Sequence, residues 1–147
     1  TGVAGLDGAV NYKDGVLRKS IKAAFPNGID VYYDNVGGEH LNATLPRMNL
    51  HGRVAACGMI SAYNDPMGLT TGVTTLSVIM YKRITIKGFT VTDHFDMKTQ
   101  FMADMRRWIR EGKMKWEETL YEGIENAPNA IIGLMTGNNL GKSVVKL

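Results

Sequence analysis

Short apolar segments alternate with segments of helical periodicity along this chain, and this alternation constrains its fold more than any other feature. Residues 29–33 and 53–57 are rich in β-branched, aromatic or small apolar side chains. Each follows a stretch with apolar residues at helical spacing, 16–25 and 39–48. Such strands, apolar throughout, are typical of parallel strands covered by helices on both faces. The pattern therefore predicts an α/β fold with a doubly wound parallel sheet.

The same alternation continues through the rest of the chain. The further predicted elements are helices over 75–82, 96–111 and 124–135 and strands over 85–91, 118–123 and 143–147. Residues 8–12 are typical of the end of a strand, which predicts that the chain starts in the middle of the sheet. The methionine-rich apolar stripe of the 96–111 helix is interpreted as core packing, because methionine fills irregular gaps.

Composition excludes several classes of protein. The 147 residues carry 17 Lys and Arg against 14 Asp and Glu, and the resulting charge of +3 is too weak and too scattered to indicate a nucleic-acid partner. Apolar stretches stay well short of the roughly 20 residues that span a bilayer, and the first residues do not resemble a signal peptide. We expect no membrane partner and a cytoplasmic location.

Metal binding is not expected either. The single cysteine, Cys57, cannot form an intrachain disulfide or a zinc-binding thiolate cluster. His40, His51 and His94 have no metal-ligand spacing, so we interpret them as solvated or hydrogen-bonded structural residues.

Candidate binding residues follow the predicted strands, because open parallel sheets bind ligands beyond the carboxyl ends of their strands. The turn Asp34–Gly38 offers a carboxylate, an amide and two glycines that allow close approach to the backbone. Its Asp or Asn could equally cap the next helix. At the next strand end, Gly58 could serve a ligand or only a tight turn, and Cys57 is expected to be an inert, buried thiol.

Two further features bear on chemistry. Tyr63 is a possible proton donor, although its spacing alone favours an ordinary loop phenol. The chain contains no GxGxxG motif, the glycine-rich turn whose backbone N–H groups receive a pyrophosphate.

Three motifs, in register along essentially the whole chain, resemble a known family. They are GIDVYYDNVGGE at 28–39, GRVAACGMISAYN at 52–64 and NNLGK at 138–142. Together they resemble the zinc-independent medium-chain dehydrogenase/reductase family, and most of all its prostaglandin, alkenal double-bond and curcumin reductase branch. The resemblance implies that residues 1–112 form the second half of an NADPH-binding Rossmann domain. It also implies that residues 113–147 return to a GroES-like catalytic domain.

The resemblance further implies roles for single residues. Tyr12 would lie beside the adenosine 2′-phosphate, Asn35 would contact the ribose and nicotinamide side, and Asn139 would reach the pyrophosphate. The stretch lining the nicotinamide would comprise Cys57, Gly58, Met59, Ile60, Ser61 and Tyr63, and the segment binding its carboxamide would comprise Phe89, Thr90 and Val91. Tyr63 is the catalytic candidate, as hydrogen-bond donor to a developing enolate, although ribose hydroxyls of the cofactor could do the same.

The implied activity is NADPH-dependent reduction of the carbon–carbon double bond of an enal or enone by hydride transfer. The alternatives are a quinone reductase of the same superfamily and a non-catalytic nucleotide-binding or interaction domain.

The isolated chain is expected to be inactive, since it lacks the glycine-rich turn. We also expect preference for NADPH over NADH from Tyr12 and Lys13. A homodimer is expected through the apolar edge strand 85–91, unless Lys87 and Gly88 protect that edge.

Overall fold

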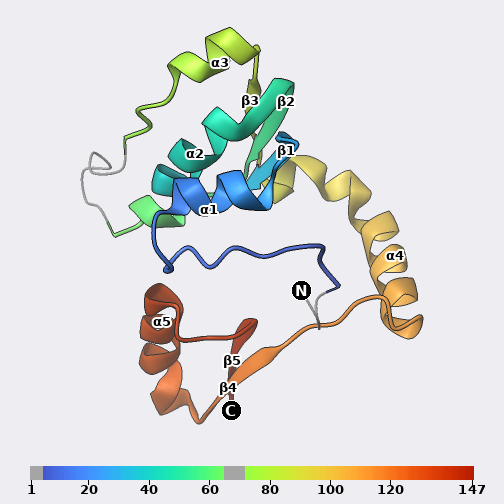
Figure 1. The fold of residues 1–147 in the computed structure, drawn as a ribbon. Helices are drawn as coiled ribbons and strands as arrows, with labels where there is room; N and C mark the ends of the chain where they lie inside the picture. The colour runs from blue at the N-terminus through green and yellow to red at the C-terminus, as the bar shows by residue number, and fades with distance from the viewer. Residues whose placement is uncertain (1–4, 65–71) are drawn as a thin grey trace. The chain divides into compact units, whose positions relative to one another are not determined.

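The chain forms two compact units of parallel α/β structure (Figure 1). The computed structural model describes residues 5–64 and 72–147. One unit spans Asp7–Asp96 and carries a three-stranded sheet, and the other is built mainly from Met97–Leu147 and carries a two-stranded sheet. Every strand pair is parallel, which confirms the predicted class of sheet. In the described residues no helix is long and apolar enough to cross a membrane.

Two successive strand–helix–strand connections build the larger sheet, in the order β1-β2-β3. Helices predicted over 16–25 and 75–82 and the strand over 29–33 are confirmed, within one or two residues at each end. The elements in order are α1 (Leu17–Ala24), β1 (Ile29–Asp34), α2 (Gly38–Thr44), η1 (Leu45–Arg47), β2 (Met48–Ala56), η2 (Ile60–Ala62), α3 (Ser77–Lys82), β3 (Thr85–Gly88) and η3 (Val91–Met97), where η denotes a 3₁₀ helix.

The boundary between the second helix and the second strand differs from the prediction. The α-helix ends at Thr44, because Pro46 lacks an N–H group and the chain continues as the 3₁₀ turn η1. β2 then begins at Met48, five residues before the predicted start at 53. His51, expected to separate helix and strand, lies inside β2 with φ of 61°. The pairing of β1 with β2 is irregular at this point, which accommodates the additional residues.

Two predicted strands are shorter or absent. Residues 8–12 form no strand, because no neighbouring strand pairs with them in the part of the chain that the structure describes. β3 ends at Gly88 and not at 91. The N–H of Phe89 donates to the carbonyl of Ala56 at 3.2 Å, and beyond it the chain turns into η3. The apolar edge strand therefore presents four residues, all exposed.

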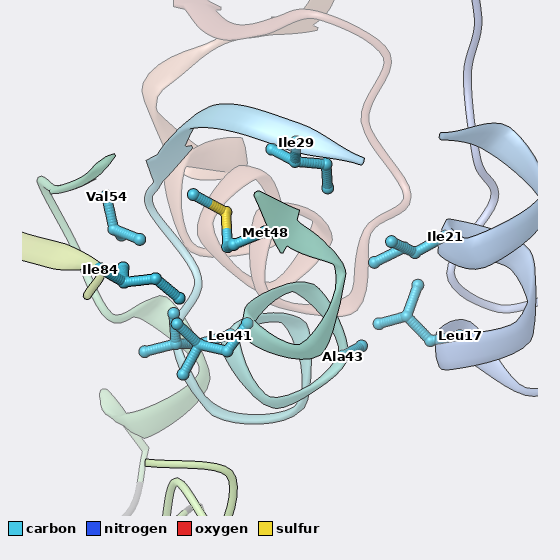
Figure 2. Packing of buried hydrophobic residues seen from close by; sticks show 9 residues of the cluster. Leu17, Ile21, Ile29, Leu41, Ala43, Met48, Val54 and Ile84 are labelled. Carbon is cyan, nitrogen blue, oxygen red and sulfur yellow. The ribbon is translucent and has the colours of Figure 1, made fainter. Parts of the chain in front are cut away.

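One face of the larger sheet carries the core (Figure 2). Side chains of α1 and α2 pack there against the strands, and Leu45 and Met48 are 0% and 1% exposed. The cluster comprises Leu17, Ile21, Ile29, Leu41, Ala43, Leu45, Met48, Val54 and Ile84. The opposite face presents exposed Val31, Arg53 and Thr85, which lie in one pairing row. Within the described part of residues 7–96, α-helices therefore cover one face of this sheet.

The second unit joins a long helix to a small sheet. Its elements are α4 (Lys98–Arg110), β4 (Glu118–Glu122), η4 (Ile124–Asn126), α5 (Ala127–Thr136) and β5 (Lys142–Lys146), and β4 pairs with β5. These confirm the helices and strands predicted after residue 96. Pro128 stands in the first turn of α5, where its missing N–H breaks no helical hydrogen bond.

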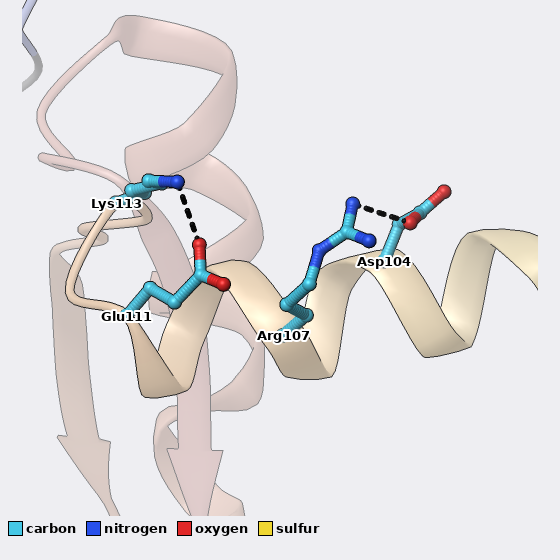
Figure 3. Close-up of polar contacts among 4 residues, drawn as sticks. All are labelled: Asp104, Arg107, Glu111 and Lys113. Atoms are coloured by element: carbon cyan, nitrogen blue, oxygen red, sulfur yellow. Dashed lines mark hydrogen bonds and ion pairs between the residues drawn. The ribbon is translucent and has the colours of Figure 1, made fainter.

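The apolar stripe of α4 is exposed, so its interpretation as core packing is wrong. Met97, Phe101 and Trp108 are 54%, 57% and 36% exposed, because no described element of this unit covers them. Polar contacts flank the stripe (Figure 3): Arg107 pairs with Asp104, and Lys113 with Glu111, each at 2.7 Å. Such exposed ion pairs contribute about 0–1 kcal/mol each.

Candidate functional site

β1 ends in a turn organised by a buried carboxylate. Asp34 is 2% exposed, and its Oδ1 accepts hydrogen bonds from the Tyr32 hydroxyl and the N–H groups of Val36 and Gly37, each at 2.9 Å. Gly37 is the N-cap of α2, so the helix begins without a side-chain capping bond. Asp34 therefore closes the turn instead of capping α2, and it leaves the Asn35 side chain exposed.

The Tyr32 phenol is a permanent donor to this carboxylate. Burial, together with the hydrogen bond from Tyr32 to Asp34 and the negative charge of Asp34, raises the pKa of Tyr32 well above its ordinary value. The hydroxyl therefore keeps its proton throughout the physiological pH range.

Four backbone hydrogen bonds and one from the Ser61 hydroxyl join the segment after β2 to the same turn. Carbonyl oxygens of the turn accept five bonds from this segment, which fixes the two loops against each other. The donors and acceptors are Cys57 N to Asp34 O at 2.8 Å, Gly58 N to Asp34 O at 3.1 Å, Ile60 N to Asn35 O at 3.1 Å, Ser61 N to Val36 O at 3.2 Å and Ser61 Oγ to Val36 O at 2.5 Å.

Polar side chains gather around Gly58. A Cβ at this position would lie 3.4 Å from both the Asn35 Oδ1 and the Tyr63 hydroxyl, so the absence of a side chain permits their approach. The Tyr33 phenol interacts with the side chains of Cys57 and Asn35, and its hydrogen bond with Cys57 raises the pKa of Tyr33. We call Tyr33, Asn35, Cys57 and Tyr63 the edge cluster, because they lie at the carboxyl ends of β1 and β2.

The edge cluster brings together Cys57 and Tyr63 of the second motif and Asn35 of the first, with one correction and one addition. Cys57 is exposed, against the expected burial, because β2 ends at Ala56 and the chain turns there toward the β1 turn. Sequence reasoning missed Tyr33. Strand alternation contains the signal, since it places Tyr33 and the half-buried Tyr32 on opposite faces of β1.

The Phe89–Val91 segment borders this cluster through its aromatic ring. The Phe89 ring lies 6.0 Å from that of Tyr33 and 5.9 Å from that of His94. The N–H of Thr90 donates to Asp93 at 3.4 Å, and Val91 is exposed. The Phe89 N–H, the Thr90 N–H and the Thr90 carbonyl therefore all have partners within the chain.

The remaining predicted residues lie elsewhere. Tyr12 is exposed, and its ring lies 5.2 Å from that of His40, with the Lys13 ammonium 5.9 Å from its ring centroid. Asn139 belongs to the smaller unit, where its side-chain N–H donates to the carbonyl of Gly141 at 2.8 Å. Among the described residues, no group of three or more His, Cys, Asp or Glu side chains could hold a metal ion.

The edge cluster has the position and chemistry of a nucleotide site. Parallel α/β sheets bind nucleotides beyond the carboxyl ends of their strands, where this cluster lies. Its exposed phenols and amide can hydrogen-bond a ribose or a carboxamide. The residues fit the ribose and nicotinamide side of a dinucleotide, whereas a glycine-rich pyrophosphate turn is not part of the 147-residue sequence. Fold and cluster together are those of a nucleotide-binding type of α/β protein with a parallel sheet.

Comparison with known proteins identifies the family. The family model described as zinc-binding dehydrogenase matches residues 3–108, so the chain belongs to the zinc-binding dehydrogenase family. It is 43% identical over 142 residues to the 2-alkenal reductase (NADP(+)-dependent) of Nicotiana tabacum, covering 96% of this chain and 41% of that protein. Prostaglandin reductase 1 of Bos taurus is 41% identical over 144 residues, covering 97% and 44%.

A solved structure is also similar. The crystal structure of CurA in complex with NADPH from Vibrio vulnificus matches with a TM-score of 0.85 and 37% identity, over 97% of this chain and 43% of that chain. These similarities confirm the resemblance to the alkenal, prostaglandin and curcumin reductase branch. The chain spans about two fifths of the length of the relatives that it matches.

Proposed function

We propose that the protein carrying this chain is an NADP-dependent reductase of the carbon–carbon double bond of α,β-unsaturated aldehydes or ketones. Residues 1–112 are the second half of its cofactor domain, and residues 113–147 belong to its catalytic domain. The observation that carries this proposal is the edge cluster, an exposed set of donors and acceptors at the sheet edge where nucleotides bind. The 43% identity to a protein named 2-alkenal reductase supports the substrate class.

Different parts of the chain would hold different parts of NADPH. The Asn35 amide would hydrogen-bond the ribose on the nicotinamide side, and the backbone from Cys57 to Ser61 would line the nicotinamide ring. Tyr12 and Lys13 offer a phenol and a cation, which suit the 2′-phosphate, whereas a carboxylate at this position would repel it. NADPH is therefore the expected cofactor in preference to NADH.

The chain's own contribution to the reaction is an oxyanion partner. The nicotinamide group, when bound, supplies the hydride. Tyr63 donates a hydrogen bond to the carbonyl oxygen of the enal or enone, where negative charge develops as the β-carbon gains the hydride and before the α-carbon gains a proton. The phenol is 64% exposed and lies beside Gly58, so it is accessible to a substrate at the edge cluster.

Turnover by the complete protein tests this proposal. NADPH oxidation is followed spectroscopically against a panel of enals, enones and quinones. We expect turnover of enals and enones, with higher catalytic efficiency for NADPH than for NADH. Turnover of quinones alone would favour the quinone reductase alternative. Binding of NADPH without turnover of any compound would contradict the enzyme proposal and favour a nucleotide-binding domain.

We further propose that the protein is a cytoplasmic homodimer. β3 lies at the edge of its sheet with all four residues exposed, so pairing with a second copy would satisfy its open backbone groups. The single, exposed Cys57 suits a reducing compartment. Analytical ultracentrifugation of the complete protein should give a dimer, and Ile86→Pro should shift it to monomer while circular dichroism stays unchanged. A dimer unaffected by this substitution would contradict the edge-strand interface.

A further inference from the structure

We propose that Asp34 is a positioning residue that preorganises the edge cluster for NADPH; this inference rests on the proposed function. One atom, the Asp34 Oδ1, accepts three hydrogen bonds. One comes from the preceding Tyr32, and two come from the turn after Asp34. A buried carboxylate is costly unless its oxygens are hydrogen-bonded, so these donors hold the turn in one conformation.

The same residue also controls the second loop through its main chain. The Asp34 carbonyl accepts the N–H groups of Cys57 and Gly58 at 2.8 and 3.1 Å. The side chain of Asp34 thus fixes the turn after β1, and its backbone fixes the segment after β2. Movement of Asp34 would displace both loops that carry the edge cluster.

Asn35 is the residue through which this effect reaches a ligand. It stands between Asp34 and Val36, and its Oδ1 lies 3.4 Å from the Cβ position of Gly58. With the Asp34 hydrogen bonds removed, the turn samples further conformations, and binding must restore the ordered one. The loss acts on cofactor binding in ground state and transition state alike. It therefore raises the Kd and KM for NADPH and leaves kcat at saturating NADPH nearly unchanged.

The variants Asp34→Ala, Asp34→Asn and Tyr32→Phe, made in the complete protein, test the inference in graded steps. Asp34→Ala removes all three acceptor bonds, and we expect the NADPH Kd to rise roughly tenfold to hundredfold. Asp34→Asn retains a carbonyl oxygen for the turn and should recover much of the affinity. Tyr32→Phe removes one donor without creating a cavity and should weaken binding least. It keeps the inference testable should Asp34→Ala fail to fold.

Asp30→Ala is the matched control. Asp30 lies on the same strand and accepts a hydrogen bond from Asn49 at 2.8 Å, but it stands at the opposite end of β1 from the edge cluster. It should leave the NADPH Kd unchanged. The measurements are NADPH Kd by fluorescence titration, KM and kcat by turnover, and Tm.

The outcomes separate this inference from the proposed function. A raised Kd and KM with a retained kcat, in the graded order above, supports positioning. A lowered Tm with wild-type Kd in folded Asp34→Asn and Tyr32→Phe would overturn it, because Asp34 would then serve stability alone. An equal rise in Asp30→Ala would overturn it too. A wild-type protein that binds no NADPH would overturn the proposed function and this inference together.

Discussion

Gly37→Ala should strain the turn that carries the candidate site. Gly37 has φ of 68° and ψ of −151°, a conformation that is nearly restricted to glycine. A Cβ at this position would also lie 2.7 Å from the Cγ of Met59, which is close to the main chain and cannot simply swing away. The substitution therefore acts in two ways, through backbone strain and through a steric clash with the loop after β2.

The backbone strain can appear either as lower stability or as weaker NADPH binding. Holding a non-glycine residue in this conformation costs about 1–3 kcal/mol. If the turn keeps its conformation, this cost appears as a lower free energy of unfolding. If the turn relaxes in the free protein, binding must restore the strained conformation, and the NADPH Kd rises roughly 5-fold to 150-fold, since about 1.4 kcal/mol corresponds to a factor of ten. The clash with Met59 adds to either loss.

Stability and affinity are therefore measured together, by chemical denaturation and by NADPH titration of the complete protein. Gly88→Ala is the matched control, because its Cβ would meet its nearest neighbour at 4.0 Å and its φ is not positive. The double variant Gly37→Ala with Met59→Ala should relieve the steric clash, because alanine lacks the Cγ, and should retain the backbone strain. Wild-type stability together with wild-type affinity in Gly37→Ala would refute the assigned turn geometry.

Three further predictions concern other side chains. Tyr63→Phe should lower kcat/KM for enones by up to about 10²-fold with little change in NADPH Kd, and wild-type kinetics would leave Tyr63 without a catalytic role. Because folding raises the pKa of Tyr32, the folded state keeps a proton that the unfolded state releases above about pH 10, so stability falls there as pH rises. Denaturation at several pH values should show that the free energy of unfolding falls less at alkaline pH in Tyr32→Phe than in the wild type. Lys82→Met should lower the free energy of unfolding by about 1.5–3 kcal/mol, since Lys82 Nζ donates to the carbonyls of Pro46 and Met48 at 2.8 and 2.7 Å; an unchanged denaturation midpoint would contradict this.

Local patterns in the sequence were sufficient for most elements and for the position of the site. Apolar spacing predicts α1 and α4, and runs of β-branched and aromatic residues predict β1, β4 and β5, because these signals arise from neighbours along the chain. Parallel strands also place ligand sites at their carboxyl ends. That rule points to the turn after β1 and to the segment after β2.

The sequence alone could not show which groups meet at that edge. The exposure of Cys57, the contact of Tyr33 with Cys57 and Asn35, and the closure of the turn by Asp34 all depend on how two strands align. The alignment includes an irregularity near the start of both strands, where Ile29 pairs with Met48 but Val31 pairs with Arg53.

Burial was likewise decided beyond the local pattern. The stripe of α4 has the periodicity of a core helix, yet its residues are exposed, since a stripe shows which face is apolar and not what covers it. The sequence by itself determined most of the elements, their parallel arrangement and the edge that carries the site, because these follow from interactions between near neighbours. Strand register, side-chain convergence and burial were decided only in the tertiary structure, because they depend on contacts between residues far apart in the chain.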